Sequence, residues 1–574
     1  MENNLPASDK HLRKTLGVYY TPHVLALALA KWAVRCPKER ILDPSFGGCA
    51  FLHAGQEALA AVGAQHPERL VFGVDVHPEA ASFSRLILEQ QARKEQFLVT
   101  DFLTVTPEST GMGSFDIVLG NPPYVRHHLL KGRTRESAVY AAQRAGIRIG
   151  GRASYWAYFV AHCLSFLASE GRLALLLPTA FLYAEYADEL RREIVRRFRS
   201  TMIILLRERV FEDAQERTVI LLAEGFGSGP GEARIVTAGS VEALHQMLGS
   251  PTPAGKSFNG NGTDRHWLCH MMTERGTALY QELTASSEVM TLGDLCSIRI
   301  GTVTGANDFF VLSRQAQKQH EIPHSCLKPI LTRSSLLRGL TFAEQDWLAL
   351  ITQGTTPALV LDTNSLGVLP DSVERYLSRG VSAGIPERYK CRTRSPWHSV
   401  PMSPPPDAFL QYMSARRPRL VLNQTSATCT NAIHVANWHD SVSEPLPSCV
   451  ATSILSSLTQ LSSELVGRSY GGGVLKLEPN EARQLVIALP SNGNSDACEK
   501  RAEVDGLLRD GKGEQASQLV DDWILRLHLG LSMNDVRCLR ANIALLQRLR
   551  IDKNTLRPRR VSHPSPEANP QIAE

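Results

Sequence analysis

The chain of 574 residues has eleven cysteines, but none of them stand in a Cys-x-x-Cys pair. Closely spaced cysteines are typical of structural zinc sites and of disulfide frameworks, so the sequence predicts neither. A chain of this length also buries enough apolar surface to fold without such cross-links. We therefore expect a protein of the reducing cytoplasm that holds no metal.

Long apolar runs are absent as well. No segment approaches the roughly 18 apolar residues of a membrane span, and residues 1–14 lack the apolar centre of a signal peptide. The balance of 62 basic against 57 acidic residues leaves a formal charge of only +5. Such a chain can bind nucleic acid through a local basic surface, and we expect no membrane partner.

Short apolar runs alternate with helical patterns in the first 225 residues. This alternation predicts an α/β fold with a doubly wound, mostly parallel sheet. No long helical pattern separates the last two runs, so we expect them to form a closing hairpin. The predicted strands lie at 40–42, 70–74, 96–99, 115–119, 173–177, 202–206 and 218–223. The predicted helices lie at 22–34, 51–62, 154–168 and 187–198.

Changes of composition predict the domain boundaries. Segments rich in Gly, Ser and Pro occur at 225–231 and 251–262. We expect a first domain over 1–228, a linker over 229–264 and a mixed α+β domain over 265–490. A helical segment over 491–556 and a disordered tail over 557–574 should follow. Predicted strands of the second domain lie at 297–300, 309–312, 347–351, 358–361 and 419–422.

The tetrad Asn121-Pro122-Pro123-Tyr124 follows the predicted strand 115–119 almost directly. The amide oxygen of Asn121 and the carbonyl of Pro122 can accept both hydrogens of a nucleobase amino group, which draws its lone pair toward the nitrogen. Tyr124 offers a flat face on which an extruded base can stack. The tetrad therefore favours chemistry on an exocyclic amine, although such dipeptides also occur in ordinary turns.

Three earlier strand ends carry groups that suit a nucleoside-containing ligand. The strand 40–42 leads into Asp43, Pro44 and a glycine loop that includes Gly47. Asp75 ends the next strand and suits a ribose diol. Asp101 and Phe102 follow the third strand, where a carboxylate can bind an adenine amine and a ring can pack on the base. Ligands bind at this edge of open α/β sheets.

In this order, these motifs resemble the gamma class, or TaqI-like, DNA adenine methyltransferases of restriction–modification systems. The resemblance covers about residues 17–225 and, more loosely, continues to about 490. It implies a Rossmann-like class I methyltransferase domain over 1–228, a target-recognition domain over 265–490 and S-adenosylmethionine as cofactor. Cys49 replaces the second glycine of the family's first motif, and we expect the adjacent Gly48 to supply the conformational freedom.

The same resemblance assigns roles to further residues. Tyr20 and Thr21 correspond to a segment that contacts the methionine part of the cofactor, and Val76 to the residue that packs on its adenine. Phe159 corresponds to an aromatic residue that closes the cofactor pocket, although it equally suits the core of a helix. Phe211 corresponds to the residue that stacks on the flipped base.

Basic residues crowd the segment that follows the tetrad. We expect a phosphate-contacting loop here, with DNA-binding residues Arg126, His127, Lys131, Arg133, Arg135 and Arg148. Later segments, among them the one around Arg394, resemble blocks of the family's target-recognition region. Several of these blocks suit a structural role equally well.

The sequence thus predicts a DNA adenine-N6 methyltransferase that acts on duplex DNA, with a cognate restriction endonuclease as a possible partner. Alternatives remain open: transfer to the cytosine 4-amino group, RNA methylation, modification of a glutamine in a protein, or a DNA-binding component without catalysis. Asn121 in place of Ser favours adenine over cytosine. The region 290–490 argues against the protein-modifying relatives, which are much shorter.

Overall fold

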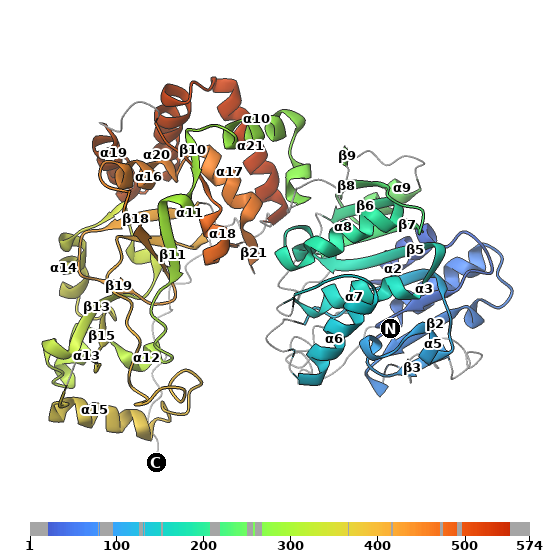
Figure 1. The fold of residues 1–574 in the computed structure, drawn as a ribbon, viewed down its shortest axis with the longest axis horizontal. Coiled ribbons are helices and arrows are strands. Elements are labelled where there is room, and N and C mark those ends of the chain that lie inside the picture. The colour runs from blue at the N-terminus through green and yellow to red at the C-terminus, as the bar shows by residue number, and fades with distance from the viewer. Residues whose placement is uncertain are drawn as a thin grey trace, which may run out of the picture.

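The computed structural model describes residues 21–78, 80, 96–125, 130, 132–150, 153–206, 218–249, 256–258, 267–364, 367–414, 417–470, 474–490 and 496–550. These residues form two lobes (Figure 1). The first lobe contains the residues up to 258, and the second contains those from 272 onward. The short helix Trp267–Met271 joins them: Trp267 is buried in the core of the first lobe, and Leu268 and Met271 pack against the cores of both lobes. None of the helices in these ranges is both long and apolar enough to cross a membrane.

One large sheet organises the first lobe, with strand order β3-β2-β1-β4-β5-β7-β6-β8-β9. The strands β1 to β5 pair in parallel with their neighbours, whereas β7 runs antiparallel to both β5 and β6. The expected strands and the closing β6–β7 hairpin are therefore confirmed. The strands are β1 (Ile41–Asp43), β2 (Val71–Asp75), β3 (Phe97–Val99), β4 (Phe115–Gly120), β5 (Leu167–Pro178), β6 (Phe198–Leu206), β7 (Thr218–Phe226), β8 (Glu232–Ala238) and β9 (Lys256–Phe258).

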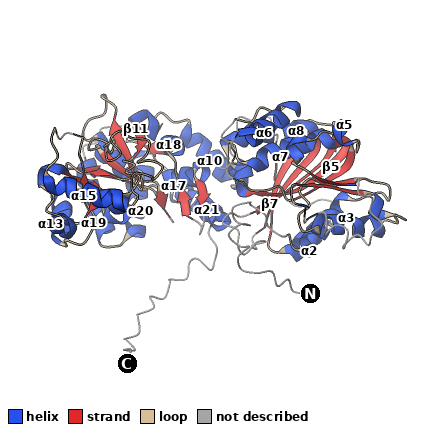
Figure 2. Cartoon of the chain, turned by 90° about the horizontal axis from the view of Figure 1, so that it is seen from below, coloured by secondary structure: helices blue, strands red, loops and turns tan. Residues whose placement is uncertain are grey.

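Helices cover both faces of this sheet (Figure 2). In β5, Leu173 and Leu175 belong to one hydrophobic cluster, while Ala174 and Leu176 belong to another. This alternation follows from the pleat, which points successive side chains to opposite faces. The helices α2 (His23–Ala33), α3 (Ala50–Ala61) and α9 (Val241–Leu248) pack on the second cluster. The first cluster contains residues of α6 (Gly132–Arg144), α7 (Tyr155–Cys163) and α8 (Asp188–Arg197).

The sheet continues into the segment 229–264, which we expected to be a linker. β8 pairs with β6, and β9 pairs with β8. In the sequence, α9 connects β8 to β9. In β8, Ile235 and Val236 contribute to opposite hydrophobic clusters, so this strand belongs to the core of the first lobe. The glycine-rich segment 225–231 contains the end of β7 and the turn into β8, and Gly225 and Gly227 have φ of 73° and 90°.

Several small sheets and a bundle of helices make up the second lobe. The larger sheets have strand orders β11-β20-β16-β18-β14 and β12-β15-β13-β19. Their strands are β11 (Cys296–Ile300), β12 (Val311–Leu312), β13 (Leu327–Leu331), β14 (Thr341–Phe342), β15 (Leu359–Leu361), β16 (Ala408–Gln411), β18 (Arg419–Asn423), β19 (Thr428–Cys429) and β20 (His434–Trp438). Two smaller sheets contain β10 (Val289–Thr291) with β23 (Val486–Ala488), and β17 (Met413–Ser414), β22 (Val474–Lys476) and β21 (Arg468–Tyr470).

Two of the strands expected in this lobe differ from the structure. The run 347–351 is helical, within α14 (Glu344–Thr352). The Asp346 carboxylate accepts the Ala343 N–H at 3.0 Å and so caps the helix, and Trp347 and Leu350 are buried one turn apart. The strand expected over 309–312 shrinks to β12, because α12 (Asn307–Phe310) precedes it.

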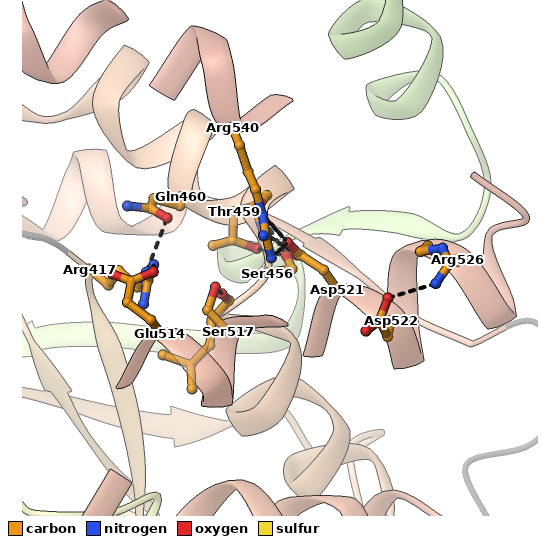
Figure 3. A network of polar contacts seen from close by, with 12 residues as sticks. Arg417, Ser456, Thr459, Gln460, Glu514, Ser517, Asp521, Asp522, Arg526 and Arg540 are labelled. Carbon is orange, nitrogen blue, oxygen red and sulfur yellow. Dashed lines mark hydrogen bonds and ion pairs between the residues drawn. The ribbon is translucent and has the colours of Figure 1, made fainter. Parts of the chain in front are cut away.

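The C-terminal helices share a hydrophobic core with the second lobe. They are α19 (Ala497–Arg509), α20 (Gly513–Val520), the π-helix Asp521–His528 and α21 (Met533–Arg550). Val504, Trp523 and Leu539 belong to the same cluster as Leu410 and Leu461. Buried polar contacts hold these helices in place as well (Figure 3). The segment expected as a separate helical unit over 491–556 is therefore packed into the second lobe over its described residues.

Candidate functional site

The carboxyl ends of β1, β2, β3 and β4 converge on one pocket. Asp43, Asp75, Asp101 and Asn121 lie at or just beyond these four strand ends, and all four line it. The complete lining consists of Thr21, Asp43, Pro44, Ser45, Phe46, Gly47, Gly48, Ala50, Phe51, Asp75, Val76, His77, Thr100, Asp101, Phe102, Asn121, Pro123, Val125, Tyr155 and Phe159. Every described residue that we predicted to bind the cofactor is in this set.

The loop after β1 ties three strand ends together. Ser45 donates its N–H to Asp43 Oδ1 at 3.0 Å and its hydroxyl to the carbonyl of Asn121 at 3.1 Å. The Gly47 N–H donates to Asp75 Oδ2 at 2.9 Å. A Cβ atom on Gly120 would lie 2.9 Å from Asp43 Oδ1, so only glycine allows β1 and β4 to approach this closely.

Cys49 occupies a conformation that normally belongs to glycine. Its φ is 62° at the N-terminus of α3, and its side chain is fully buried. We expected Gly48 to supply the conformational freedom of the missing glycine, but the left-handed residues of the loop are Gly47 and Cys49. The position of the lost glycine therefore still requires a positive φ, and a non-glycine residue adopts it with some strain.

The carboxylates of the pocket are held by hydrogen bonds. Asp75 accepts N–H groups at both oxygens, from Gly47 and from His77. Asp101 Oδ1 accepts the Leu103 N–H at 3.0 Å and the hydroxyl of Tyr155 at 2.9 Å. Burial raises the pKa of Tyr155, and the neighbouring Asp101 charge raises it further, so this hydroxyl remains a donor.

Asp43 is the most deeply buried carboxylate of the pocket, with 1% of its surface exposed. Burial raises its pKa to about 8, against the opposing effect of the Ser45 N–H. The nearby Asp75 charge adds to the increase.

Apolar groups form the remaining wall. The rings of Phe102 and Phe159 lie 4.9 Å apart and are nearly fully buried, yet both line the pocket. Phe159 therefore packs in the hydrophobic core beneath α7 and also lines the pocket. Val76 is 53% exposed at the same pocket, which leaves an apolar surface open to a flat ligand ring.

The four residues of the tetrad take different positions. Asn121 and Pro123 line the pocket, Pro122 is buried, and Tyr124 is half-buried against the hydrophobic cluster on that side of the sheet. Tyr20 and Phe211 lie outside the described residues, so the roles of these two aromatic side chains remain predictions.

Half of the predicted DNA contacts can be placed. Arg133 and Arg135 are exposed near the start of α6, and the exposed Arg148 lies 3.8 Å from Glu189. Arg126, His127 and Lys131 lie outside the described residues. In the second lobe, Arg394 donates to the carbonyls of Val303 and Thr304 at 2.7 Å each, a structural role that links two of the segments resembling target-recognition blocks.

Nine lining residues were not assigned to the site from the sequence: Ser45, Phe46, Gly48, Ala50, Phe51, His77, Thr100, Val125 and Tyr155. The signal for Tyr155 was present, because it stands one helical turn before Phe159 and therefore on the same face of α7. Its bond to Asp101 depends on the packing of α7 against the loop after β3.

Comparison with known proteins gives two family matches. Residues 5–224 match the family described as N-6 DNA Methylase, and residues 264–525 match the C-terminal domain of the type II methyltransferase M.Eco57I. The type II methyltransferase M.XamI of Xanthomonas campestris pv. amaranthicola is 26% identical over 491 residues, which are 83% of this chain and 86% of that protein. M.AccI of Acinetobacter calcoaceticus is 21% identical over 485 residues, which are 82% of this chain and 84% of that protein.

Solved structures show the same overall fold. The type IIL restriction–modification enzyme MmeI in complex with DNA aligns with a TM-score of 0.57 and 11% identity, over 94% of this chain and 76% of that chain. The DrdV–DNA complex aligns with a TM-score of 0.53 and 10% identity, over 87% of this chain and 58% of that chain.

Proposed function

Because this chain belongs to the N-6 adenine DNA methyltransferases of type II restriction–modification systems, we propose that S-adenosylmethionine is its methyl donor and a flipped-out adenine of duplex DNA its target. The observation that carries this proposal is the shared pocket. Asn121 and Pro123 of the tetrad line the same cavity as Asp75, Asp101 and Thr21. An amine acceptor thus lies beside a pocket suited to a nucleoside.

The chemistry of the pocket fits the proposed donor. A carboxylate has about four acceptor sites, so Asp75 can accept two ribose hydroxyls besides the N–H groups of Gly47 and His77. Asp101 has the same spare capacity for an adenine amine. The open apolar surface of Val76 and the ring of Phe102 supply the flat contacts for the adenine. Thr21 lines the pocket from the start of α2 and would contact the methionine part, together with Tyr20.

The remaining step is to orient the target amine. When bound, the donor supplies a methyl group that its sulfonium already activates. Asn121 Oδ1 and the Pro122 carbonyl would accept the two amine hydrogens, which directs the nitrogen lone pair toward that methyl group. Tyr124 and Phe211 would hold the base between their rings. After the attack, the extra proton on the amine passes to solvent.

We assign the second lobe to sequence recognition. Exposed arginines of the first lobe, Arg133, Arg135 and Arg148, would contact phosphates and so add a salt-dependent, sequence-independent attraction. A cognate restriction endonuclease is a further proposed partner, because the relatives M.AccI and M.XamI are type II methyltransferases.

Methylome sequencing of cells that express the protein tests the proposal directly. We expect N6-methyladenine at one defined motif, whereas N4-methylcytosine would identify the cytosine alternative. A genome without either mark, from cells that contain folded protein, would contradict the function.

The Asn121→Ala variant tests the site. Its loss of one amine acceptor should lower the methyl-transfer rate by at least about 100-fold. Binding of S-adenosylmethionine, measured by calorimetry, should change little. Asn534→Ala, at an exposed position of α21, is the matched control and should keep full activity. Wild-type rates in Asn121→Ala would remove the tetrad from the reaction.

A further inference from the structure

Three potential metal ligands meet on the surface of α2 and α3. His23 Nε2 lies 3.0 Å from His53 Nδ1, and each of these nitrogens lies 3.2 Å from Glu57 Oε1. His23 is the first residue of α2, while His53 and Glu57 stand one turn apart on α3. Among the described residues this is the group of such side chains whose donor atoms converge closely enough to hold a metal ion.

We propose that His23, His53 and Glu57 bind a divalent transition-metal ion such as Zn²⁺. Zinc binds imidazole nitrogens at about 2.0–2.1 Å and carboxylate oxygens at about 2.0–2.2 Å, in a tetrahedron. Donor atoms at these distances from a common ion are about 3.3 Å apart. The three observed separations of 3.0, 3.2 and 3.2 Å match three corners of that tetrahedron, and a water molecule can take the fourth.

Hydrogen bonds alone explain this arrangement less well than a cation does. Each of the two ring nitrogens carries at most one hydrogen, and that hydrogen points in one direction. If both nitrogens are protonated, they suit Glu57 but face each other as two donors at 3.0 Å. If only one nitrogen is protonated, its single hydrogen accounts for one of the three short separations and leaves the other two without a hydrogen. A central cation attracts all three atoms at once.

The scaffold beneath the three ligands is rigid, and the ligands themselves are accessible. Leu25 and Leu29 of α2 and Leu52 of α3 are fully buried in one hydrophobic cluster, which fixes the two helices against each other. The side chains of His23, His53 and Glu57 remain 42%, 41% and 40% exposed, so an ion can reach them from solvent.

The site adjoins the pocket of the proposed methyl donor. Thr21 lies two residues before His23, and Phe51 lies two residues before His53; both line that pocket. An ion that bridges α2 and α3 would therefore clamp both segments against the pocket. The absence of cysteine pairs predicted no metal, whereas these ligands meet only because the two helices pack against each other.

Cobalt titration of the full-length protein tests the site. After treatment with a chelator and desalting, we expect Co²⁺ to give one saturable set of tetrahedral d–d absorption bands, and Zn²⁺ to displace it. The variants His23→Ala, His53→Ala and Glu57→Gln should each weaken binding by at least about 10-fold. These side chains are half-exposed, so the variants should keep the melting temperature of the metal-free wild type.

Two controls separate this site from other ligands. His66 pairs with Glu68 at 3.4 Å but belongs to no group of three converging ligands among the described residues, so His66→Ala should leave Co²⁺ affinity unchanged. Cys36 is exposed near the end of α2, and Cys36→Ser should also retain the bands. Absence of saturable binding in the wild type, or unchanged affinity in all three ligand variants, would overturn the proposal.

A second measurement tests the clamp, and this part rests on the proposed function. Zn²⁺ should tighten binding of S-adenosylmethionine to the wild type but not to Glu57→Gln. Equal effects on both proteins would overturn the clamp. A protein that binds Co²⁺ as expected but binds no S-adenosylmethionine would reject the proposed donor and leave the metal site intact.

Discussion

At the scale of single residues, the pocket depends on atoms that lie unusually close. Gly120 brings Asp43 against β4, Gly47 brings its N–H to Asp75, and Cys49 accepts a left-handed conformation so that α3 can start immediately after the loop. Each of these features accepts a close contact or backbone strain in order to position a group that faces the pocket, as is common at functional sites.

The strain at Cys49 leads to a paired prediction. Cys49→Gly and Cys49→Ala both remove the buried sulfur, but only the alanine variant keeps a Cβ atom at a φ near 62°. We expect Cys49→Gly to be the more stable of the two by about 1 kcal/mol in chemical denaturation. Equal stability would show that the loop relaxes to a different conformation.

The buried carboxyl of Asp43 should affect the pH dependence of stability in the ligand-free protein. Its pKa is raised from its ordinary range to about 8, so the folded state binds this proton more tightly than the unfolded chain does. The stabilisation is complete below pH 4 and is lost as the pH rises toward 8.

Asp43→Asn removes this titration and can keep the bond to the Ser45 N–H. A tenfold change in proton affinity corresponds to about 1.4 kcal/mol. The difference in unfolding free energy between wild type and variant should therefore change by more than about 1.4 kcal/mol between pH 5 and pH 8. Denaturation measured at several pH values checks this, and parallel curves for the two proteins would contradict it.

At the scale of elements, buried polar groups fix the C-terminal helices. Asp521 is 1% exposed and accepts the Ser457 N–H at 2.7 Å, the Ser457 hydroxyl at 2.6 Å and Arg540 Nη2 at 2.7 Å (Figure 3). These bonds join the start of α17 (Ser457–Val466), the π-helix and α21. Burial raises the pKa of Asp521, and its three donors oppose that effect.

Arg540→Ala should therefore destabilise the second lobe by about 1–3 kcal/mol, because it leaves a buried carboxyl with fewer donors. Arg526→Ala is the matched control, since Arg526 forms an ion pair with Asp522 in which both side chains are about two-fifths exposed. We expect that control to stay within about 0.5 kcal/mol of wild type in the same urea titration. Equal losses of stability in the two variants would show that the burial of Asp521 does not determine how much its arginine partner contributes.

At the scale of the whole molecule, each of the two lobes has its own main core, and the short helix Trp267–Met271 packs against both. The first lobe has a cluster on each face of its sheet, and the second has its main cluster among the helices and small sheets. The lobes meet where Trp267 is buried in the core of the first lobe, and Gln484 forms a long hydrogen bond of 3.5 Å with Glu185. This division suits the roles that we propose for the two lobes, methyl transfer and DNA recognition, because lobes with their own main cores can move relative to each other.

Calorimetry should therefore resolve two unfolding transitions. S-adenosylmethionine at about 100 times its Kd should stabilise the first lobe by about 2.7 kcal/mol and leave the other transition nearly unchanged. Hydrogen exchange with mass spectrometry would assign each transition to a lobe. A single transition that shifts as a whole would show that the lobes unfold together.

Local patterns in the sequence were sufficient for strands β1 to β7 and for the residues at the strand ends that line the pocket. Buried strands read as short apolar runs, and the residues that end them must meet, because the carboxyl ends of parallel strands lie at one edge of a sheet. Asp43, Asp75, Asp101 and Asn121 could be placed together for this reason. The strand over 232–238 was not predicted, because glycine and proline residues flank this run.

Only the tertiary structure decided the contacts between distant elements. The run 347–351 has no period that separates strand from helix, and its cap at Asp346 decided the outcome. The bond from Tyr155 to Asp101 and the meeting of His23 with His53 depend on how helices pack, which no local pattern encodes. The mostly parallel sheet follows from the alternation of strands and helices along the chain, whereas such side-chain contacts exist only once the folded core has brought the helices together.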